Sequence, residues 1–166
     1  MEGAALAVTD TGPLIALHAV DLLSVLCSRF AEVLVPLTVW GELSALLGAP
    51  EPAAVGRLPC VRIVPDLDSL PPAVAGLDPG EQQALAIALA HPGAVVLVDD
   101  GDARRVARAE RLPLLGTIGL IAGAKDAGLC SSAREKYALL LTTRFRIDVG
   151  IVNDVLRDLG EVELSE

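Results

Sequence analysis

Up to Leu115, short runs of apolar residues alternate with longer segments in which apolar positions recur at helical spacing. The short runs are apolar at consecutive positions, as in strands of a parallel sheet that helices cover on both faces. They predict strands at Leu6–Thr9, Glu32–Val35, Val61–Val64, Val95–Val98 and Leu114–Leu115. The alternation itself is typical of an α/β fold with a parallel sheet of about five strands.

Capping residues mark the ends of the predicted helices. Pro13 can open a first helix, and Asp21 can cap a second that runs to about Phe30. Asp78–Glu81 combines an N-cap, a proline at the first helical position and a glutamate at the third, which is the capping-box arrangement. Further helices are predicted at Thr38–Leu46, Asp102–Arg111, Ile118–Ala127, Ala133–Leu141 and from Asp148 to Gly160.

The sequence as a whole predicts a single domain over residues 1–166. The segments Gly48–Pro59 and Asp66–Leu77 are expected to be loops, the first with at most one helical turn. Beyond Leu115 the pattern is wholly helical, which predicts a C-terminal extension over about residues 118–160. The apolar stretch from Leu6 to Leu26 is interrupted by Asp10 and other polar or proline positions, so neither a signal peptide nor a membrane span is expected.

The charge is unevenly distributed. The whole chain carries a formal charge of −9, which argues against a general nucleic-acid binder with a basic surface. Thirteen acidic residues face three arginines up to Asp102, whereas ten basic and nine acidic residues follow it. Affinity for anions is therefore expected in the second part of the chain.

Cysteine usage favours a reduced compartment. Cys27, Cys60 and Cys130 are far apart and form no CxxC pair, and only His18 and His91 could join them in a zinc site, so none is expected. Three sparse cysteines predict reduced, packed thiols in a cytoplasmic protein.

Several acids fall where strands end or helices begin. Asp10 follows the first strand, while Asp99 and Asp100 follow the fourth. Glu81 lies in the first turn of its helix, and Glu42 interrupts an otherwise apolar helix. In open α/β sheets ligands bind beyond the carboxyl ends of the strands, so we expect most of these acids at one edge of the sheet.

Carboxylates crowded into one crevice repel one another unless a cation neutralises them. Oxygen ligands without histidine or thiolate favour Mg²⁺ or Mn²⁺, and such ions support cleavage of phosphodiester bonds. The acids therefore predict a metal-dependent phosphoryl-transfer or nuclease site.

Each acid also has a purely structural interpretation. Asp10 can cap the helix before Pro13, Glu81 can serve only its capping box, and Glu42 can lie on a solvated helix face. The pair Asp99 and Asp100 can form a polar turn, and Asp102 is expected to be the N-cap of the next helix rather than a ligand.

Three arginines extend the predicted site. Arg104, Arg108 and Arg111 recur at helical spacing, so we expect them on one helix face close to Asp100, where they can hold RNA phosphates. The alternative is a solvated basic face. The chain has four aromatic residues, too few for an interleaved base-stacking platform.

Together these segments resemble the PIN-domain ribonucleases. Asp10–Ile15 is similar to the first acidic motif and Val33–Leu43 to the second, Leu77–Ala86 to the third, and Leu97–Arg104 to the fourth. The resemblance spans about residues 5–160 and is greatest to the branch related to VapC-type toxins of toxin–antitoxin pairs.

The resemblance implies a parallel sheet of order 3-2-1-4-5 and a Mg²⁺- or Mn²⁺-dependent endoribonuclease. It also implies a homodimer and a cognate antitoxin protein. Carried over by position, Asp10, Glu42 and Glu81 are the first three acids, and Asp99 or Asp100 is the fourth. Thr11 occupies the hydroxyl position that often follows the first acid, and together with Arg104 and Arg108 it is expected to bind substrate.

Two departures from the family pattern stand out. The third motif commonly has aspartate where this chain has Glu81, and the fourth region offers Asp99, Asp100 and Asp102 without choosing among them. Because a fold does not guarantee catalysis, a degenerate PIN module that binds RNA or protein remains the alternative.

Other acid-based enzymes fit less well. A haloacid-dehalogenase-type phosphatase needs Asp-x-Asp after the first strand, where Asp10 is followed by Thr11 and Gly12. A receiver domain needs its acidic pair there as well, and aspartic proteases, which share Asp-Thr-Gly, are all-β proteins.

Overall fold

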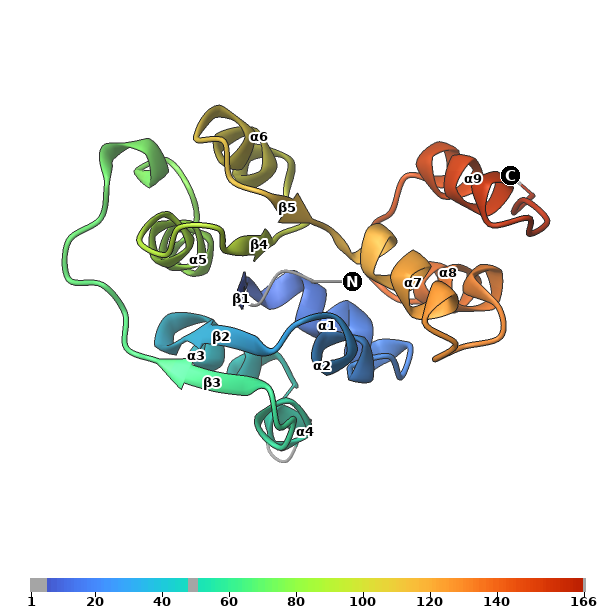
Figure 1. Ribbon diagram of the computed structural model, residues 1–166, viewed down its shortest axis with the longest axis horizontal. Coiled ribbons are helices and arrows are strands. Elements are labelled where there is room, and N and C mark those ends of the chain that lie inside the picture. The colour runs from blue at the N-terminus through green and yellow to red at the C-terminus, as the bar shows by residue number, and fades with distance from the viewer. Residues whose placement is uncertain (1–5, 48–50, 166) are drawn as a thin grey trace.

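The computed structural model describes residues 6–47 and 51–165. Five parallel strands form one sheet in the order β3-β2-β1-β4-β5, and helices lie on both of its faces, which confirms the predicted fold class (Figure 1). The strands are β1 (Leu6–Thr9), β2 (Glu32–Pro36), β3 (Val61–Val64), β4 (Val95–Leu97) and β5 (Leu114–Leu115).

The register of the central strands positions the acids. Thr9 pairs with Leu97, so β1 and β4 end side by side. The amide of Asp10 extends this pairing by donating to the carbonyl of Leu97 at 3.0 Å. The residues after both strands therefore emerge together at the carboxyl edge of the sheet.

The helices are α1 (Thr11–Ala19), α2 (Ser24–Arg29), α3 (Leu37–Leu47), α4 (Glu51–Gly56), α5 (Pro79–Leu89), α6 (Gly101–Ala109), α7 (Thr117–Asp126), α8 (Ala133–Leu141) and α9 (Val149–Asp158). Successive strand residues point to opposite faces and so enter two separate cores. Val8 and Val96 pack with α5 and α6, whereas Ala7 and Leu97 pack with α1, α2, α3 and α7.

Two of the predicted loops contain helix. The first includes α4, six residues long, in place of at most one turn, while positions 48–50 lie outside the described residues. The second contains a 3-10 turn over Pro72–Val74. Strand β3 also differs from the prediction, because Ile63 is 41% exposed at the edge of the sheet. An edge strand has only one neighbour, so its apolar run is not covered on both faces.

Local backbone geometry corrects three predicted helix ends. Asp21 has a φ of 56°, so it forms a turn, and α2 begins only at Ser24. Asp102 is not the N-cap of α6, because Asp100 fills that position and accepts from the amides of Asp102 and Ala103. Arg111, with a φ of 58°, lies beyond the end of α6, so it does not share a helix face with Arg104 and Arg108.

The C-terminal helices gather on one side of the molecule, orange to red in Figure 1. Helix α7 buries Leu120 and Ile121 in the same core as α1 and α2. The hydroxyl of buried Tyr137, on α8, donates to the carbonyl of Ile118 at 2.7 Å. Ser132 and Asp148 cap α8 and α9 through their side chains, as predicted. The Tyr137 hydrogen bond therefore holds α8 against α7, while the two caps define where α8 and α9 begin.

Cys27 and Cys60 form a disulfide, so the prediction of three reduced thiols is wrong for this pair. Their Cα atoms lie 5.3 Å apart, within the usual range for a bridge. The bridge links α2 to the residue preceding β3, whereas Cys130 is a free thiol. Sequence spacing concealed the pair because 33 positions separate its members. In the described ranges, no helix combines the length and apolar character needed to cross a bilayer.

Candidate functional site

A pocket of about 330 Å³ opens at the carboxyl edge of the sheet, and its lining is dominated by acids. We call it the acidic pocket. Four of the five predicted acids meet there, so segments far apart in the sequence converge as predicted. Its lining consists of Asp10, Thr11, Glu42, Asp78, Pro79, Glu81 and Asp100.

Asp10 occupies the N-cap position of α1, but its side chain makes no capping hydrogen bond. The interpretation of Asp10 as a helix cap is therefore wrong. Burial raises its pKa to about 6, and the negative charges of Glu42, Asp99 and Asp100 add to the effect. A carboxylate held in this way gains stability from any nearby cation.

Glu42 connects the beginnings of two helices. Its Oε2 accepts from the hydroxyl of Thr11 at 2.7 Å, and its Oε1 accepts from the amide of Gly80 at 3.1 Å. A Cβ on Gly80 would lie 2.9 Å from Oε1, so only glycine leaves room for this approach. Glu42 is thus anchored rather than solvated, which excludes the alternative of an exposed helix face.

Glu81 completes the capping box of α5 with only one of its two carboxylate oxygens. Its Oε1 accepts from the amide of Asp78 at 3.3 Å, as the sequence pattern predicts. Its Oε2 is buried and, among the described residues, has no hydrogen-bond partner. Burial raises the pKa of Glu81 to about 8, with further contributions from Asp100 and Asp10. The capping role therefore accounts for only one of its two oxygens.

Asp100 likewise both caps a helix, α6, and lines the acidic pocket. Its Oδ1 accepts from the amides of Asp102 at 2.9 Å and Ala103 at 3.1 Å. The side chain nevertheless lines the acidic pocket. Asp102 does not line it and pairs instead with Arg105 on the exposed side of α6.

Asp99 lies outside the acidic pocket and is bound to the protein through both oxygens. They accept from the amide and the hydroxyl of Thr117, each at 2.7 Å, at the first residue of α7. Burial raises the pKa of Asp99, while these hydrogen bonds and the Arg104 charge oppose the rise. Of the two candidates for the fourth acid, Asp100 lines the pocket and Asp99 fastens α7 to β4.

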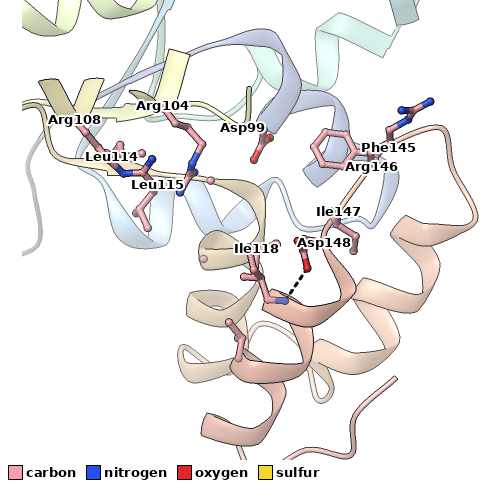
Figure 2. Close-up of a pocket in the computed structure, with 14 residues that line it drawn as sticks. Asp99, Arg104, Arg108, Leu114, Leu115, Ile118, Phe145, Arg146, Ile147 and Asp148 are labelled. Atoms are coloured by element: carbon pink, nitrogen blue, oxygen red, sulfur yellow. Dashed lines mark hydrogen bonds between the residues drawn. The ribbon is translucent and has the colours of Figure 1, made fainter. Parts of the chain in front are cut away.

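A second pocket, of about 450 Å³, begins on the other side of Asp99. We call it the arginine pocket. Arg104 and Arg108 reach into it from α6, and an apolar wall faces them (Figure 2). That wall comes from α7, α9 and the segment before α9. The predicted substrate-binding residues are therefore divided, with Thr11 in the acidic pocket and both arginines in this one.

Sequence reasoning missed the contribution of the C-terminal segment to this second pocket. Phe145 and Ile147 line it, although their positions in the sequence carry no motif. Thr117 and Gly116 were also missed as partners of Asp99. A Cβ on Gly116 would lie 2.9 Å from Asp99 Oδ1, so the glycine permits this contact. A glycine–threonine pair directly after β5 was the available signal.

The chemistry of the acidic pocket fits a hard divalent cation. Its donors are oxygens, burial and mutual repulsion raise two of their pKa values, and Glu81 Oε2 is buried without a partner. Within residues 6–47 and 51–165, however, no three histidine, cysteine or acidic side chains are arranged as a ready ligand set. The donor types therefore fit a divalent cation, but the donor side chains are not arranged as a closed coordination shell.

Comparison with known proteins identifies the family. A family model described as a PIN domain matches residues 6–161. The chain belongs to the PIN-domain family. Among solved structures, this PIN domain is similar to the PIN domain endonuclease Utp24, with a TM-score of 0.48 and 15% identity over 67% of this chain and 84% of that one. No curated protein matches it in sequence. The family and the sheet order agree with the resemblance seen in the sequence, while the VapC-type branch stays a prediction.

Proposed function

We propose that this PIN domain is an endoribonuclease that depends on Mg²⁺ or Mn²⁺ and cleaves phosphodiester bonds at the acidic pocket. The observation that carries the proposal is the convergence of Asp10, Glu42, Glu81 and Asp100 around a buried, unpartnered carboxylate oxygen. These four residues would hold the cation, and Asp99 would position the adjoining backbone.

The residues of the acidic pocket would have different roles in hydrolysis of the phosphodiester bond. A divalent cation, when bound, supplies positive charge that favours deprotonation of water and offsets the charge of the phosphate. Burial and neighbouring negative charges raise the pKa values of Asp10 and Glu81, and a bound cation would favour the charged form of both carboxylates. Glu42 keeps the beginnings of α1 and α5 together, and the hydroxyl of Thr11 orients Glu42.

The alternative is a catalytically inactive PIN module that binds RNA or protein. One observation favours it, namely that in the described part of the chain no three carboxylates are arranged to hold a metal. Under the nuclease proposal the carboxylates draw together when the cation binds. Metal binding and cleavage therefore separate the two functions.

The test is cleavage of a labelled RNA of mixed sequence, in EDTA and in millimolar Mg²⁺ or Mn²⁺. We expect cleavage only with the metal. Asp10→Asn should abolish it while keeping the fold, because removing one charge relieves repulsion among the acids. Asp68→Asn, an exposed acid outside the pocket, is the matched control. Wild-type rates in Asp10→Asn would refute the proposed site.

Metal binding is measured separately by thermal unfolding. A ligand that binds only the folded state raises its stability by about 1.4 kcal/mol at ten times its Kd. Mn²⁺ should therefore raise the Tm of the wild type and of Asp68→Asn but not of Asp10→Asn. Absence of both a Tm shift and cleavage would support the inactive module.

The biological setting belongs to the same proposal. The resemblance to VapC-type toxins supports a cytoplasmic toxin that forms a homodimer and is inhibited by a cognate antitoxin protein. Exposed apolar side chains on α8, among them Leu139 and Leu141, are compatible with such contacts. Light scattering of the purified protein tests the dimer. Growth arrest on expression, absent with Asp10→Asn, tests toxicity.

A further inference from the structure

We infer that the arginine pocket binds one nucleotide of single-stranded RNA beside the cleaved bond, with its phosphate on Arg108 and its base against the wall that contains Phe145. This inference rests on the proposed function and adds a substrate subsite to it. The C-terminal helices thereby become part of the substrate-binding surface.

The first support is continuity with the acidic pocket. Asp99 lines the arginine pocket, and the next residue in the chain, Asp100, lines the acidic pocket. A Cβ on Gly12, in the first turn of α1, would lie 3.5 Å from Asp99 Oδ2. The two pockets are thus neighbours along the carboxyl edge, and a strand of RNA lying along that edge would meet both.

The second support is charge. Both acids that line the arginine pocket are engaged, because Asp99 binds Thr117 and Asp148 caps α9 by accepting from the amide of Ile151 at 3.1 Å. Arg104 donates to the carbonyl of Val98 at 3.1 Å. Within the described ranges, no hydrogen bond or ion pair holds the guanidinium of Arg108, which points into the pocket (Figure 2). An available guanidinium in a protein of charge −9 is suited to a phosphate.

The third support is the apolar wall opposite the arginines. Phe145, Ile118 and Ile147 line it, and the ring of Phe145 faces the pocket while the side chain of Arg146 points away (Figure 2). Ile151 adds a side chain that is 52% exposed. A flat aromatic ring with aliphatic neighbours accommodates a base in a sequence-tolerant manner.

A cation opposite an apolar wall matches the phosphate and the base of a nucleotide. Only an unpaired base can leave its stack and enter such a pocket, so single-stranded RNA fits and a continuous duplex does not. An acidic, apolar peptide is the competing occupant. RNA is favoured because the pocket adjoins the site at which the proposed reaction breaks an RNA backbone.

The phosphate contact is tested by binding, without catalysis. The probe is a fluorescein-labelled 12-nucleotide oligouridylate, and anisotropy is measured in EDTA over a range of salt concentrations. Arg108→Ala should weaken binding and reduce the slope of log K against log salt by about 0.7, the value for one phosphate contact on a single strand. Arg105→Ala, on the same helix but outside the pocket, should change the slope little.

The base contact is tested with an abasic strand of the same length. Phe145→Leu keeps an apolar side chain, so urea unfolding should be nearly unchanged. Its affinity for oligouridylate should fall by about 5- to 150-fold, as for the loss of one stacked base, while its affinity for the abasic strand stays the same.

Equal effects of Arg108→Ala and Arg105→Ala would overturn the inference, as would equal losses on both strands for Phe145→Leu. A wild type that does not bind oligouridylate would overturn it too. Unchanged RNA binding in every variant would overturn it as well and would leave the acidic, apolar peptide as the competing occupant. None of these results depends on the cleavage assay, in which only wild-type activity of Asp10→Asn refutes the nuclease site.

Discussion

The acidic pocket and the arginine pocket differ in how their charged side chains are stabilised, and Asp99 lines only the second. In the first, buried carboxylates raise one another's pKa values and leave an oxygen unpartnered. In the second, arginines face an apolar wall, and the lining acids are satisfied by the amides and hydroxyl of helix starts. The comparison teaches that acid content alone does not define a metal site, because the carboxylates of Asp99 and Asp148 already accept hydrogen bonds at the starts of helices.

The largest expected effect separates acids inside the acidic pocket from those outside it. Asp100→Asn keeps an N-cap residue for α6 but removes a charge from the pocket, so cleavage should fall by about 100-fold or more. Asp102→Asn removes the same charge outside the pocket and should leave the rate nearly unchanged. RNA cleavage rates for both variants give the answer. Equal rates would remove Asp100 from the proposed site.

The next prediction tests how closely the acidic pocket is packed. Gly80→Ala should destabilise the protein by about 1–3 kcal/mol, because the new methyl group meets the carboxylate of Glu42. Gly41→Ala, where a Cβ meets nothing within 4 Å, should stabilise α3 by about 0.5–1 kcal/mol. Urea unfolding measures both changes. A neutral Gly80→Ala would show that Glu42 is not confined.

The boundary between the pockets is tested at Thr117. Thr117→Val removes a hydroxyl donor from buried Asp99, at an expected cost of about 1–3 kcal/mol. A similar pair joins Thr38 at the start of α3 to Asp66 after β3, through its amide at 3.0 Å and its hydroxyl at 2.5 Å. Because Thr38 is only half-buried, Thr38→Val should cost about 0.5–1 kcal/mol. The reverse order in chemical denaturation would contradict the role of burial.

The last prediction concerns the pH dependence of stability without divalent metal. The raised pKa values of Asp10, about 6, and Glu81, about 8, mean that the folded protein retains protons that the unfolded chain releases near pH 4. Stability is therefore fully present below about pH 4 for these groups and is lost as the pH rises to about 8. Glu81→Gln should flatten the upper part of the Tm curve. Arg108→Ala should leave its shape unchanged, since arginine does not titrate there.

The fold was predictable because its signals are local. Consecutive apolar residues gave β1 and β4, and the capping box at Asp78 gave the start of α5. The positions of Asp10 and Asp100 followed from where strands end in a parallel sheet. Such inferences need only a few neighbouring residues and one topological rule.

The remaining features depend on how distant segments cross. The Glu42–Gly80 contact joins residues 38 positions apart and requires α3 to meet α5, which no local pattern encodes. The orientation of α9 likewise decides that the segment containing Phe145 completes a pocket begun by α6. Asp100 and Asp102 lie only two residues apart, and sequence patterns do not locate a helix start with that precision. They could therefore not decide which of the two is the N-cap of α6.

The disulfide between Cys27 and Cys60 turns the intervening chain into a closed ring that contains β2 and α3. Glu42 is carried by that ring, so its distance from α2, which holds Cys27, is restricted even before the sheet has formed. The search for the contact between Glu42 and Thr11 then begins from a tethered loop rather than from a free chain. In its oxidised form, the protein has covalently limited the ways in which its acidic pocket can assemble.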